Sequence, residues 1–124
     1  MTTNLQKVEA FIEAWNRCDG AAIISAFAPD AVYHNIPMEP IHGRDAIGQA
    51  IEGLLADMSD VQWIVSAIAE AVDGTVLTER VDAFKLGGKA VSLPVMGTFV
   101  FRDGLIVRWA DYFDLASYRA QLGG

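Results

Sequence analysis

Two charged residues stand on a predicted β-strand among apolar neighbours. In the segment VLTERVDAF, residues 76–84, strand side chains alternate between two faces, so Arg80 and Asp82 point the same way. The other residues of that face are Val76, Thr78 and Phe84. Such a pair is either a salt bridge on the surface or a buried pair that performs acid–base chemistry. The residue types of this strand leave both interpretations open.

The last predicted strand, residues 105–113, repeats this anomaly with one carboxylate. Asp111 shares its face with Leu105, Val107, Trp109 and Phe113. A carboxylate buried without a partner is costly or has a raised pKa, so we expect a donor beside it. Arg80 is the best candidate, because its guanidinium can bridge two acids. Two acids in different environments can then take the roles of general acid and general base.

A third segment, AVYHNI at residues 31–36, predicts a short strand with Tyr33 and Asn35 on one face. Their hydroxyl and amide could hold a water beside the acids, and their joint occurrence with Arg80 and the two aspartates favours a catalytic site. His34 points the opposite way and His42 precedes a loop glycine. Neither histidine has a second ligand at metal-binding spacing, so we expect no metal site.

Elements that position these residues follow from the periodicity. Helices are predicted near 4–18, 21–28, 43–58 and 114–122, with strands at 31–36, 61–70, 75–86, 90–101 and 105–113. Thr3 and Gln6 resemble a capping box, Pro29 is expected to close the second helix, and Asp114 to cap the last one. Cys18 is expected to pack within the first helix. The turns at 73–74, 87–88 and 103–104 predict hairpins.

The order of these elements predicts an α+β fold. We expect N-terminal helices packed on a strongly curved, mixed but mainly antiparallel sheet, which forms a cone-shaped pocket. The 124 residues are expected to form a single domain, residues 1–124.

Composition excludes several classes of function. The net charge of −7 and the lack of a basic run argue against nucleic-acid binding. The single cysteine excludes an internal disulfide. The chain has no apolar run of signal-peptide or membrane-spanning length, so we expect a cytoplasmic protein that does not bind membranes. A hydrophobic content of 52% predicts an apolar pocket or a subunit interface.

Five segments together resemble the limonene-1,2-epoxide hydrolase family, part of the superfamily shaped like nuclear transport factor two and the ketosteroid isomerases. They are VYHNIP (32–37), GRDAI (43–47), TERVD (78–82), MGTF (96–99) and WADYFDL (109–115), and they span nearly the whole chain. The resemblance implies that the enzyme adds water in one step to an apolar, terpene-like or cyclic epoxide to give a vicinal diol. It also implies that no covalent intermediate, cofactor or metal takes part, and that the chain forms a homodimer through its sheet.

The same resemblance implies a role for each polar residue. Asp111 would be the general base, Asp82 the general acid and Arg80 the bridge between them, while Tyr33 and Asn35 would hold the water. The apolar pocket would be lined by Leu54, Met58, Phe84, Leu93, Val95, Phe113 and Tyr118. Two departures from the family, Ala110 in place of an arginine and a start without a long N-terminal extension, are expected to affect the substrate rather than the reaction.

Two other classes of function stay open at this point. An isomerase or cyclase on the ketosteroid isomerase-like scaffold would use one acid as the base with an oxyanion donor, and it would not need Arg80 between two acids. A non-catalytic binding module would keep the cavity and release an apolar ligand unchanged. Diol formation from an epoxide in isotopically labelled water distinguishes hydrolysis from both.

Overall fold

The computed structural model describes residues 2–123 and confirms the predicted α+β fold. The elements are α1 (Asn4–Asn16), α2 (Gly20–Ser25), β1 (Phe27–Asn35), β2 (Ile41–His42), α3 (Arg44–Asp57), β3 (Met58–Glu70), β4 (Val76–Leu86), β5 (Lys89–Arg102), β6 (Leu105–Tyr112) and α4 (Leu115–Gln121).

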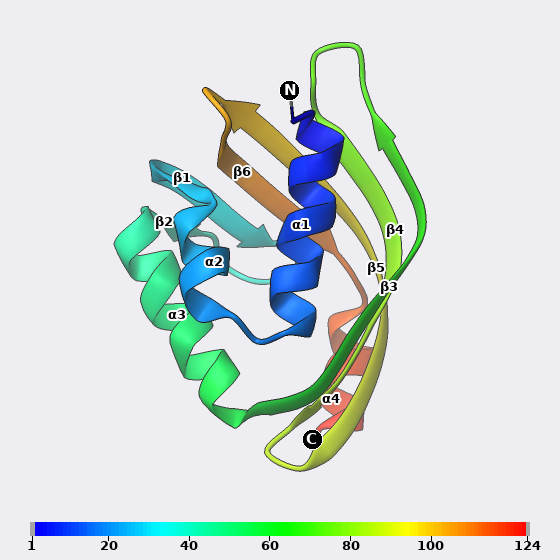
Figure 1. Ribbon diagram of the computed structural model, residues 1–124. Helices are drawn as coiled ribbons and strands as arrows, with labels where there is room; N and C mark the ends of the chain where they lie inside the picture. The colour runs from blue at the N-terminus through cyan, green and yellow to red at the C-terminus, as the bar shows by residue number, and fades with distance from the viewer. Residues whose placement is uncertain (1, 124) are drawn as a thin grey trace.

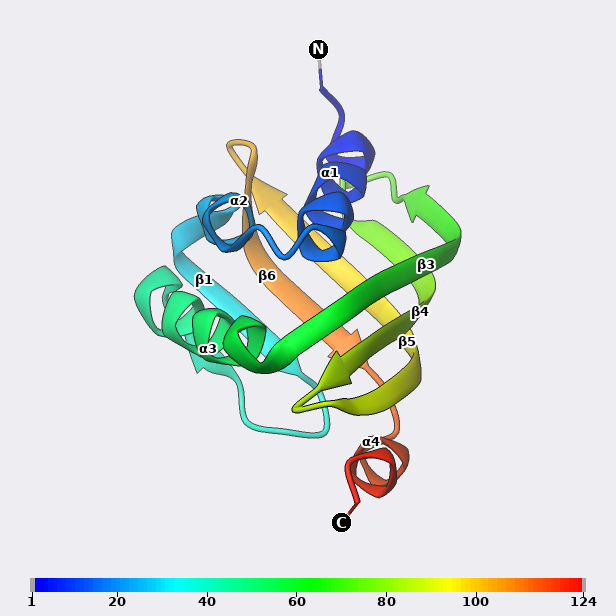
Figure 2. The same ribbon diagram turned by 60° about the horizontal axis from the view of Figure 1, so that its bottom comes forward.

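The strands form one mixed sheet in the order β2-β1-β6-β5-β4-β3. All neighbouring strands run antiparallel except β1 and β6, which pair in parallel. Figure 1 shows the sheet curving around α1, α2 and α3 on its concave side, with α4 at the end where the C-terminus lies. In Figure 2, β3 starts at the end of α3 and runs along β4 at the edge of the sheet. The curved sheet and its helices thus enclose the core.

Two of the predicted hairpins have two-residue loops in which both residues adopt positive φ. Gly87 and Gly88 join β4 to β5, and Asp103 and Gly104 join β5 to β6. This geometry is the type I′ turn, whose twist matches that of the flanking strands, and glycine and aspartate are among the residues that adopt it most readily. These turns begin the two pairings, and together with a register shift in β6 they place residues of β4, β5 and β6 in one row.

Helix α1 packs its apolar stripe into the concave face of the sheet. Thr3 and Gln6 form the predicted capping box, with Thr3 Oγ1 accepting from the Gln6 N–H at 3.1 Å and Gln6 Oε1 accepting from the Thr3 N–H at 3.0 Å. Phe11 points its edge at the ring of Trp109, with centroids 5.0 Å apart at 87°. Aromatic pairs prefer this edge-to-face arrangement, so the contact with α1 helps to hold the ring of Trp109 in place.

The predictions for the second helix and for Cys18 were wrong. Helix α2 ends at Ser25 and β1 begins at Phe27, so Pro29 lies inside a strand. Pro29 falls where the pairing of β1 with β6 shifts register, a place that tolerates a residue without an N–H. Cys18 follows the end of α1 in the left-handed region, with φ of 54°, and its side chain is exposed.

The prediction of which β6 side chains face the core is correct only for the second half of the strand. Val100 pairs with Arg108 but Phe101 pairs with Ile106, so β6 has one extra residue, a β-bulge at Val107. Before the bulge the alternation is reversed, and Ile106 is buried where Leu105 and Val107 were predicted to be. After it, Trp109 and Asp111 both face the core as predicted.

Candidate active site

Arg80 bridges the two aspartates inside the protein. Its Nε and Nη2 atoms donate to the two carboxylate oxygens of Asp82, both at 2.9 Å. Nη2 also donates to Asp111 Oδ2 at 2.7 Å. The exposed fractions of Arg80, Asp82 and Asp111 are 1%, 5% and 4%. Of the two interpretations that the sequence left open, the structure excludes the surface salt bridge.

Asp111 accepts a second hydrogen bond from its own strand. Trp109 Nε1 donates to Asp111 Oδ1 at 2.7 Å. Trp109 was predicted only as an apolar neighbour of Asp111, although an indole two residues away on the same strand face is a donor within reach. The two oxygens of this carboxylate are therefore held by two different residues, which fixes its plane in the pocket.

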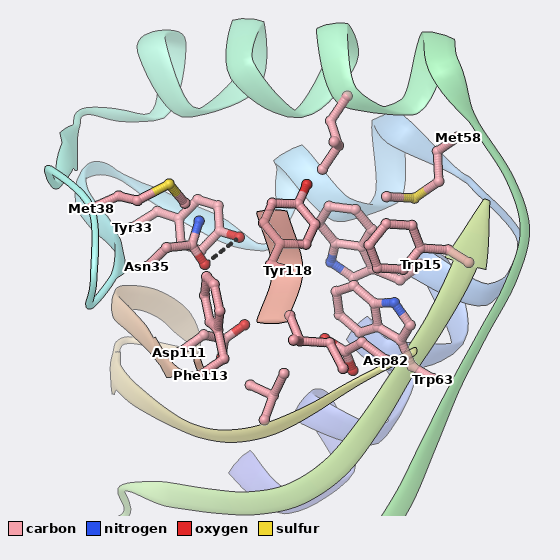
Figure 3. Close-up of a pocket in the computed structure, with 14 residues that line it drawn as sticks. Trp15, Tyr33, Asn35, Met38, Met58, Trp63, Asp82, Asp111, Phe113 and Tyr118 are labelled. Atoms are coloured by element: carbon pink, nitrogen blue, oxygen red, sulfur yellow. Dashed lines mark hydrogen bonds between the residues drawn. The ribbon is translucent and has the colours of Figure 1, made fainter. Parts of the chain in front are cut away.

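Strand β1 brings Tyr33 and Asn35 beside Asp111 through the parallel pairing with β6. Tyr33 lies opposite Trp109 and Asn35 opposite Asp111. The ring of Tyr33 stacks on Trp109, with centroids 4.3 Å apart and planes 8° from parallel. Its hydroxyl donates to Asn35 Oδ1 at 3.3 Å, the bond drawn as a dashed line in Figure 3. The hydroxyl and the amide thus meet at the side of the pocket that Asp111 occupies.

These polar groups open on a cavity of about 80 Å³. Asp82, Asp111, Tyr33 and Asn35 line it, together with all seven residues predicted for the pocket, Leu54, Met58, Phe84, Leu93, Val95, Phe113 and Tyr118 (Figure 3). Arg80 lies behind the two carboxylates and does not line this cavity. The cavity is therefore polar where the carboxylates lie and apolar elsewhere.

Three further lining residues were not predicted: Trp15, Met38 and Trp63. Trp15 carried the apolar periodicity of a core residue, and Met38 lies in a loop without any periodicity. Trp63 on β3 pairs with Asp82 on β4, and the guanidinium carbon of Arg80 lies 5.0 Å from its ring centroid. This cation–π contact adds an aromatic face to the surroundings of the guanidinium.

Burial controls the protonation of these residues. It raises the pKa of Asp82 to about 6, against the hydrogen bonds and charge of Arg80. Burial also raises the pKa of Asp111, opposed by Arg80 and by the hydrogen bond from Trp109. For Arg80, burial lowers the pKa, but the two carboxylates outweigh this effect and the guanidinium stays charged. Burial raises the pKa of Tyr33, so its hydroxyl remains a donor.

Among residues 2–123, no group of three or more histidine, cysteine, aspartate or glutamate side chains is placed to hold a metal ion. His34 lies outside the pocket and its Nε2 forms a hydrogen bond with the carbonyl of Met38, at 2.9 Å. None of the helices described is long and apolar enough to cross a membrane. Asp114 caps α4 as predicted, with its carboxylate accepting from the Ala116 N–H at 3.0 Å.

Comparisons with known proteins show the family to which the chain belongs. The model of the limonene-1,2-epoxide hydrolase catalytic domain matches residues 2–122. The epoxide hydrolase EphG of Mycobacterium tuberculosis is 37% identical over 110 residues, which cover 87% of this chain and 71% of EphG.

Solved structures show the same fold. A limonene-1,2-epoxide hydrolase-like epoxide hydrolase from M. tuberculosis has a TM-score of 0.84 at 29% identity, covering 96% of this chain and 88% of that one. A hypothetical protein with a ketosteroid isomerase-like fold from Catenulispora acidiphila, solved in complex with trimethylamine, has a TM-score of 0.82 at 25% identity, covering 95% of this chain and 92% of that one. Taken with the match over residues 2–122 and the identity to EphG, the buried acid–arginine–acid arrangement leads to one conclusion: the chain belongs to the limonene-1,2-epoxide hydrolase family and is an epoxide hydrolase.

Proposed function

We propose that the protein adds water in one step to an apolar epoxide and releases a vicinal diol. The observation that carries this proposal is the buried Arg80 guanidinium between two carboxylates that both line one pocket. An epoxide ring is strained but its oxygen leaves poorly as an alkoxide, so removing a proton from water and delivering one to the oxygen together lowers the barrier. The pocket supplies one acid for each transfer.

Charge balance supports the assignment of the two acids. Two carboxylates and one guanidinium leave one negative charge in excess, and a single bound proton neutralises it in this buried setting. Asp111 accepts a hydrogen bond from Trp109 in addition to Arg80, which favours its ionised form. Among the described residues, Asp82 has Arg80 as its only donor. We therefore assign the proton to Asp82 as the general acid and the free carboxylate to Asp111 as the general base.

In the proposed step, a water held by Asp111, Tyr33 and Asn35 attacks one epoxide carbon. Asp111 takes a proton from this water as the new carbon–oxygen bond forms. The ring bond to the epoxide oxygen breaks, and Asp82 gives its proton to that oxygen. Arg80 stays protonated throughout and holds both acids. The enzyme returns to its starting state when Asp111 releases the proton that it gained and Asp82 takes up a proton.

The apolar lining supports a hydrocarbon-rich substrate, such as a terpene-like or cyclic epoxide. The cavity of about 80 Å³ is well below the roughly 300–1,000 Å³ of typical ligand pockets, so a substrate of that kind enters only if side chains move. Met38 and Met58 both line the cavity, and methionine adapts its shape readily because its side chain is long and unbranched. We infer that these two side chains adjust to the substrate.

A second copy of the chain is the proposed partner at the convex face of the sheet. Large apolar side chains with exposed fractions of 36–52% lie on four of the six strands of the sheet. They are Ile64 on β3, Leu77 and Val81 on β4, Met96 on β5 and Tyr112 on β6. Such a group of exposed apolar side chains on neighbouring strands supports the homodimer through the sheet that the family resemblance implies.

Labelled water and two asparagine variants test the reaction. A single turnover of a cyclic epoxide in ¹⁸O-labelled water is expected to give a diol with one labelled oxygen. A covalent carboxylate intermediate would instead transfer an unlabelled enzyme oxygen in that first turnover. Asp111→Asn and Asp82→Asn are each expected to lower kcat by about 10²–10⁴-fold, the usual contribution of general acid–base catalysis. Each variant is expected to keep a cooperative thermal transition.

Asp30→Asn is the matched control for these variants. Asp30 pairs with Arg102 at 2.6 Å, but their side chains are 64% and 55% exposed. This acid–arginine pair lies on the surface and away from the pocket, so the substitution is expected to leave diol formation unchanged. A folded Asp111→Asn protein with wild-type activity would contradict the proposed roles.

A further inference from the structure

The bridge between the two acids has to cross a whole strand. Asp82 and Arg80 belong to β4, whereas Asp111 belongs to β6, and β5 lies between them. Neighbouring strands are about 4.8 Å apart, so the backbones of β4 and β6 are separated by about 10 Å. A side chain of β5 on the concave face would normally fill this space. The Arg80 guanidinium nevertheless reaches Asp111 Oδ2 at 2.7 Å.

The crossing point is Gly97, which has no side chain to obstruct it. Gly97 pairs with Thr78 on one side and Asp111 on the other, so the three residues form a row across β4, β5 and β6. The other buried residues along this face of β5 all carry apolar side chains: Val91, Leu93, Val95 and Phe99. Gly97 is therefore the gap in an otherwise continuous apolar ridge.

Space, and not backbone conformation, requires glycine at this position. Gly97 is not among the residues with positive φ, so its backbone geometry suits any amino acid. A Cβ atom placed on Gly97 would lie 2.5 Å from Arg80 Nη1 and 2.5 Å from Asp111 Oδ1, closer than a carbon atom can approach. The guanidinium and the Asp111 carboxylate thus occupy the volume that even an alanine would need.

Thr78 holds the edge of the guanidinium at the same point. Its Oγ1 accepts from Arg80 Nη1 at 3.2 Å and donates to the Gly97 carbonyl at 3.4 Å. The side chain is 1% exposed, and a β-branched residue has few rotamers on a strand. The hydroxyl is therefore a fixed acceptor for Nη1, the Arg80 nitrogen that donates to neither carboxylate.

We propose that Gly97 and Thr78 are positioning residues for the reaction, which together seat Arg80 so that it holds Asp82 and Asp111 at once. This inference rests on the proposed acid and base roles of the two aspartates. Without the seat, Arg80 keeps its two bonds to Asp82 and loses Asp111. Asp111 then lies buried without its cation, and it takes up a proton at a pH where the base has to be free.

Four variants test this seat. Gly97→Ala fills the crossing point, and Thr78→Val removes the hydroxyl while keeping the shape. Thr78→Ser keeps the hydroxyl and serves as the conservative rescue. Gly53→Ala is the matched glycine control, because a Cβ on this helical residue meets no atom within 4 Å. All four proteins are compared with the wild type for kcat, KM, pH–rate profile and thermal unfolding, with a cyclic epoxide as the substrate.

Gly97→Ala is expected to lower kcat about 100-fold, as displacement of a catalytic group by about 1 Å does, with little change in KM because the apolar walls are untouched. The acid limb of its pH–rate profile is expected to move to higher pH. Arg80 lowers the pKa of Asp111 in the wild type, and this effect is lost when the two groups are separated. Thr78→Val loses one hydrogen bond to a charged group and is expected to lower kcat about 10-fold. Thr78→Ser and Gly53→Ala are expected to keep wild-type kcat and pH dependence.

Titration of the Asp111 carboxyl carbon by NMR gives a readout that does not depend on turnover. The pKa of Asp111 is expected to be higher in Gly97→Ala than in the wild type. This expectation holds whether or not the wild type makes a diol. A wild type that makes no diol would overturn the proposed function but not the positioning of Arg80. A folded Gly97→Ala protein with the kcat and the Asp111 pKa of the wild type would overturn the proposed positioning role of Gly97. If Gly97→Ala fails to fold, the Thr78 pair decides, because equal activity of the valine and serine variants overturns the role of the hydroxyl.

Discussion

Replacing Arg80 with methionine is expected to destabilise the protein by an amount that grows with pH. Methionine fills much of the same volume with an unbranched apolar side chain, so the change removes charge and donors more than packing. Arg80 donates two hydrogen bonds to Asp82, one to Asp111 and one to Thr78. All of these partners are buried, so water replaces the lost bonds only in part.

The magnitude follows from the two carboxylates that remain. Removing one partner of a buried ion pair costs about 3–5 kcal/mol. In the wild type, burial raises the pKa of Asp82 to about 6, above its unfolded value, so the folded state binds a proton more tightly and stability falls as pH rises toward 6. Above that pH, the contribution of Asp82 to the wild-type curve levels. In the variant, the carboxyl pKa values rise further, because Arg80 lowers both of them.

If the folded variant binds one proton more than its unfolded chain does, its free energy of unfolding falls by about 1.4 kcal/mol for each unit by which the pH rises. The difference between wild type and variant is therefore expected to grow by about 3 kcal/mol between pH 6 and pH 8. Urea unfolding at pH 6, 7 and 8, followed by tryptophan fluorescence, measures it. Arg102→Met is the control, because Arg102 pairs with Asp30 on the surface, and its effect is expected to be small and constant over this range.

A difference that stays constant from pH 6 to pH 8 would refute the reasoning. It would mean that the two carboxylates gain no protons when Arg80 is absent, and that Arg80 acts through packing alone. A loss below about 1 kcal/mol at pH 8 would show that the buried ion pairs are close to energetically neutral, which some buried pairs are.

Two further predictions concern activity and assembly. Because Asp82 has to be protonated as the general acid and burial raises its pKa to about 6, kcat/KM for diol formation is expected to fall about tenfold per pH unit above pH 6, and a rate independent of pH up to 9 would contradict this role. On the convex face, Met96→Glu is expected to convert the proposed dimer into monomers in analytical ultracentrifugation, whereas Val72→Glu, exposed between β3 and β4, is expected to leave it intact. A Met96→Glu protein that sediments as the wild type does would contradict the proposed interface.

Several features of the site follow from local patterns in the sequence. The alternation along β4 predicted that Arg80 and Asp82 share a face with apolar residues, and that face is buried. The same rule placed Trp109 beside Asp111 on β6. The hairpin turns after β4 and β5 were readable because only a few residues adopt positive φ at low cost. Each of these inferences depends on residues close together in the chain.

Other features were invisible to such patterns. Asn35 lies opposite Asp111 only because β1 pairs in parallel with β6, and no turn connects these strands. The β-bulge at Val107 reversed the predicted face of Leu105, and Pro29 turned out to be a strand residue at a register shift. Long-range pairing of strands determines all three, because it depends on which surfaces pack together across the core.

The sequence by itself therefore determined the residue types of the site, the faces of β4 and β6 that carry them, and the α+β class. Periodicity and turn chemistry are local, so they were sufficient for this. Only the tertiary structure decided that one guanidinium joins acids from strands that are not neighbours, and that it does so over a glycine. That decision depends on the strand order and on the register that places Gly97 between Thr78 and Asp111, neither of which is encoded in any single stretch of the chain.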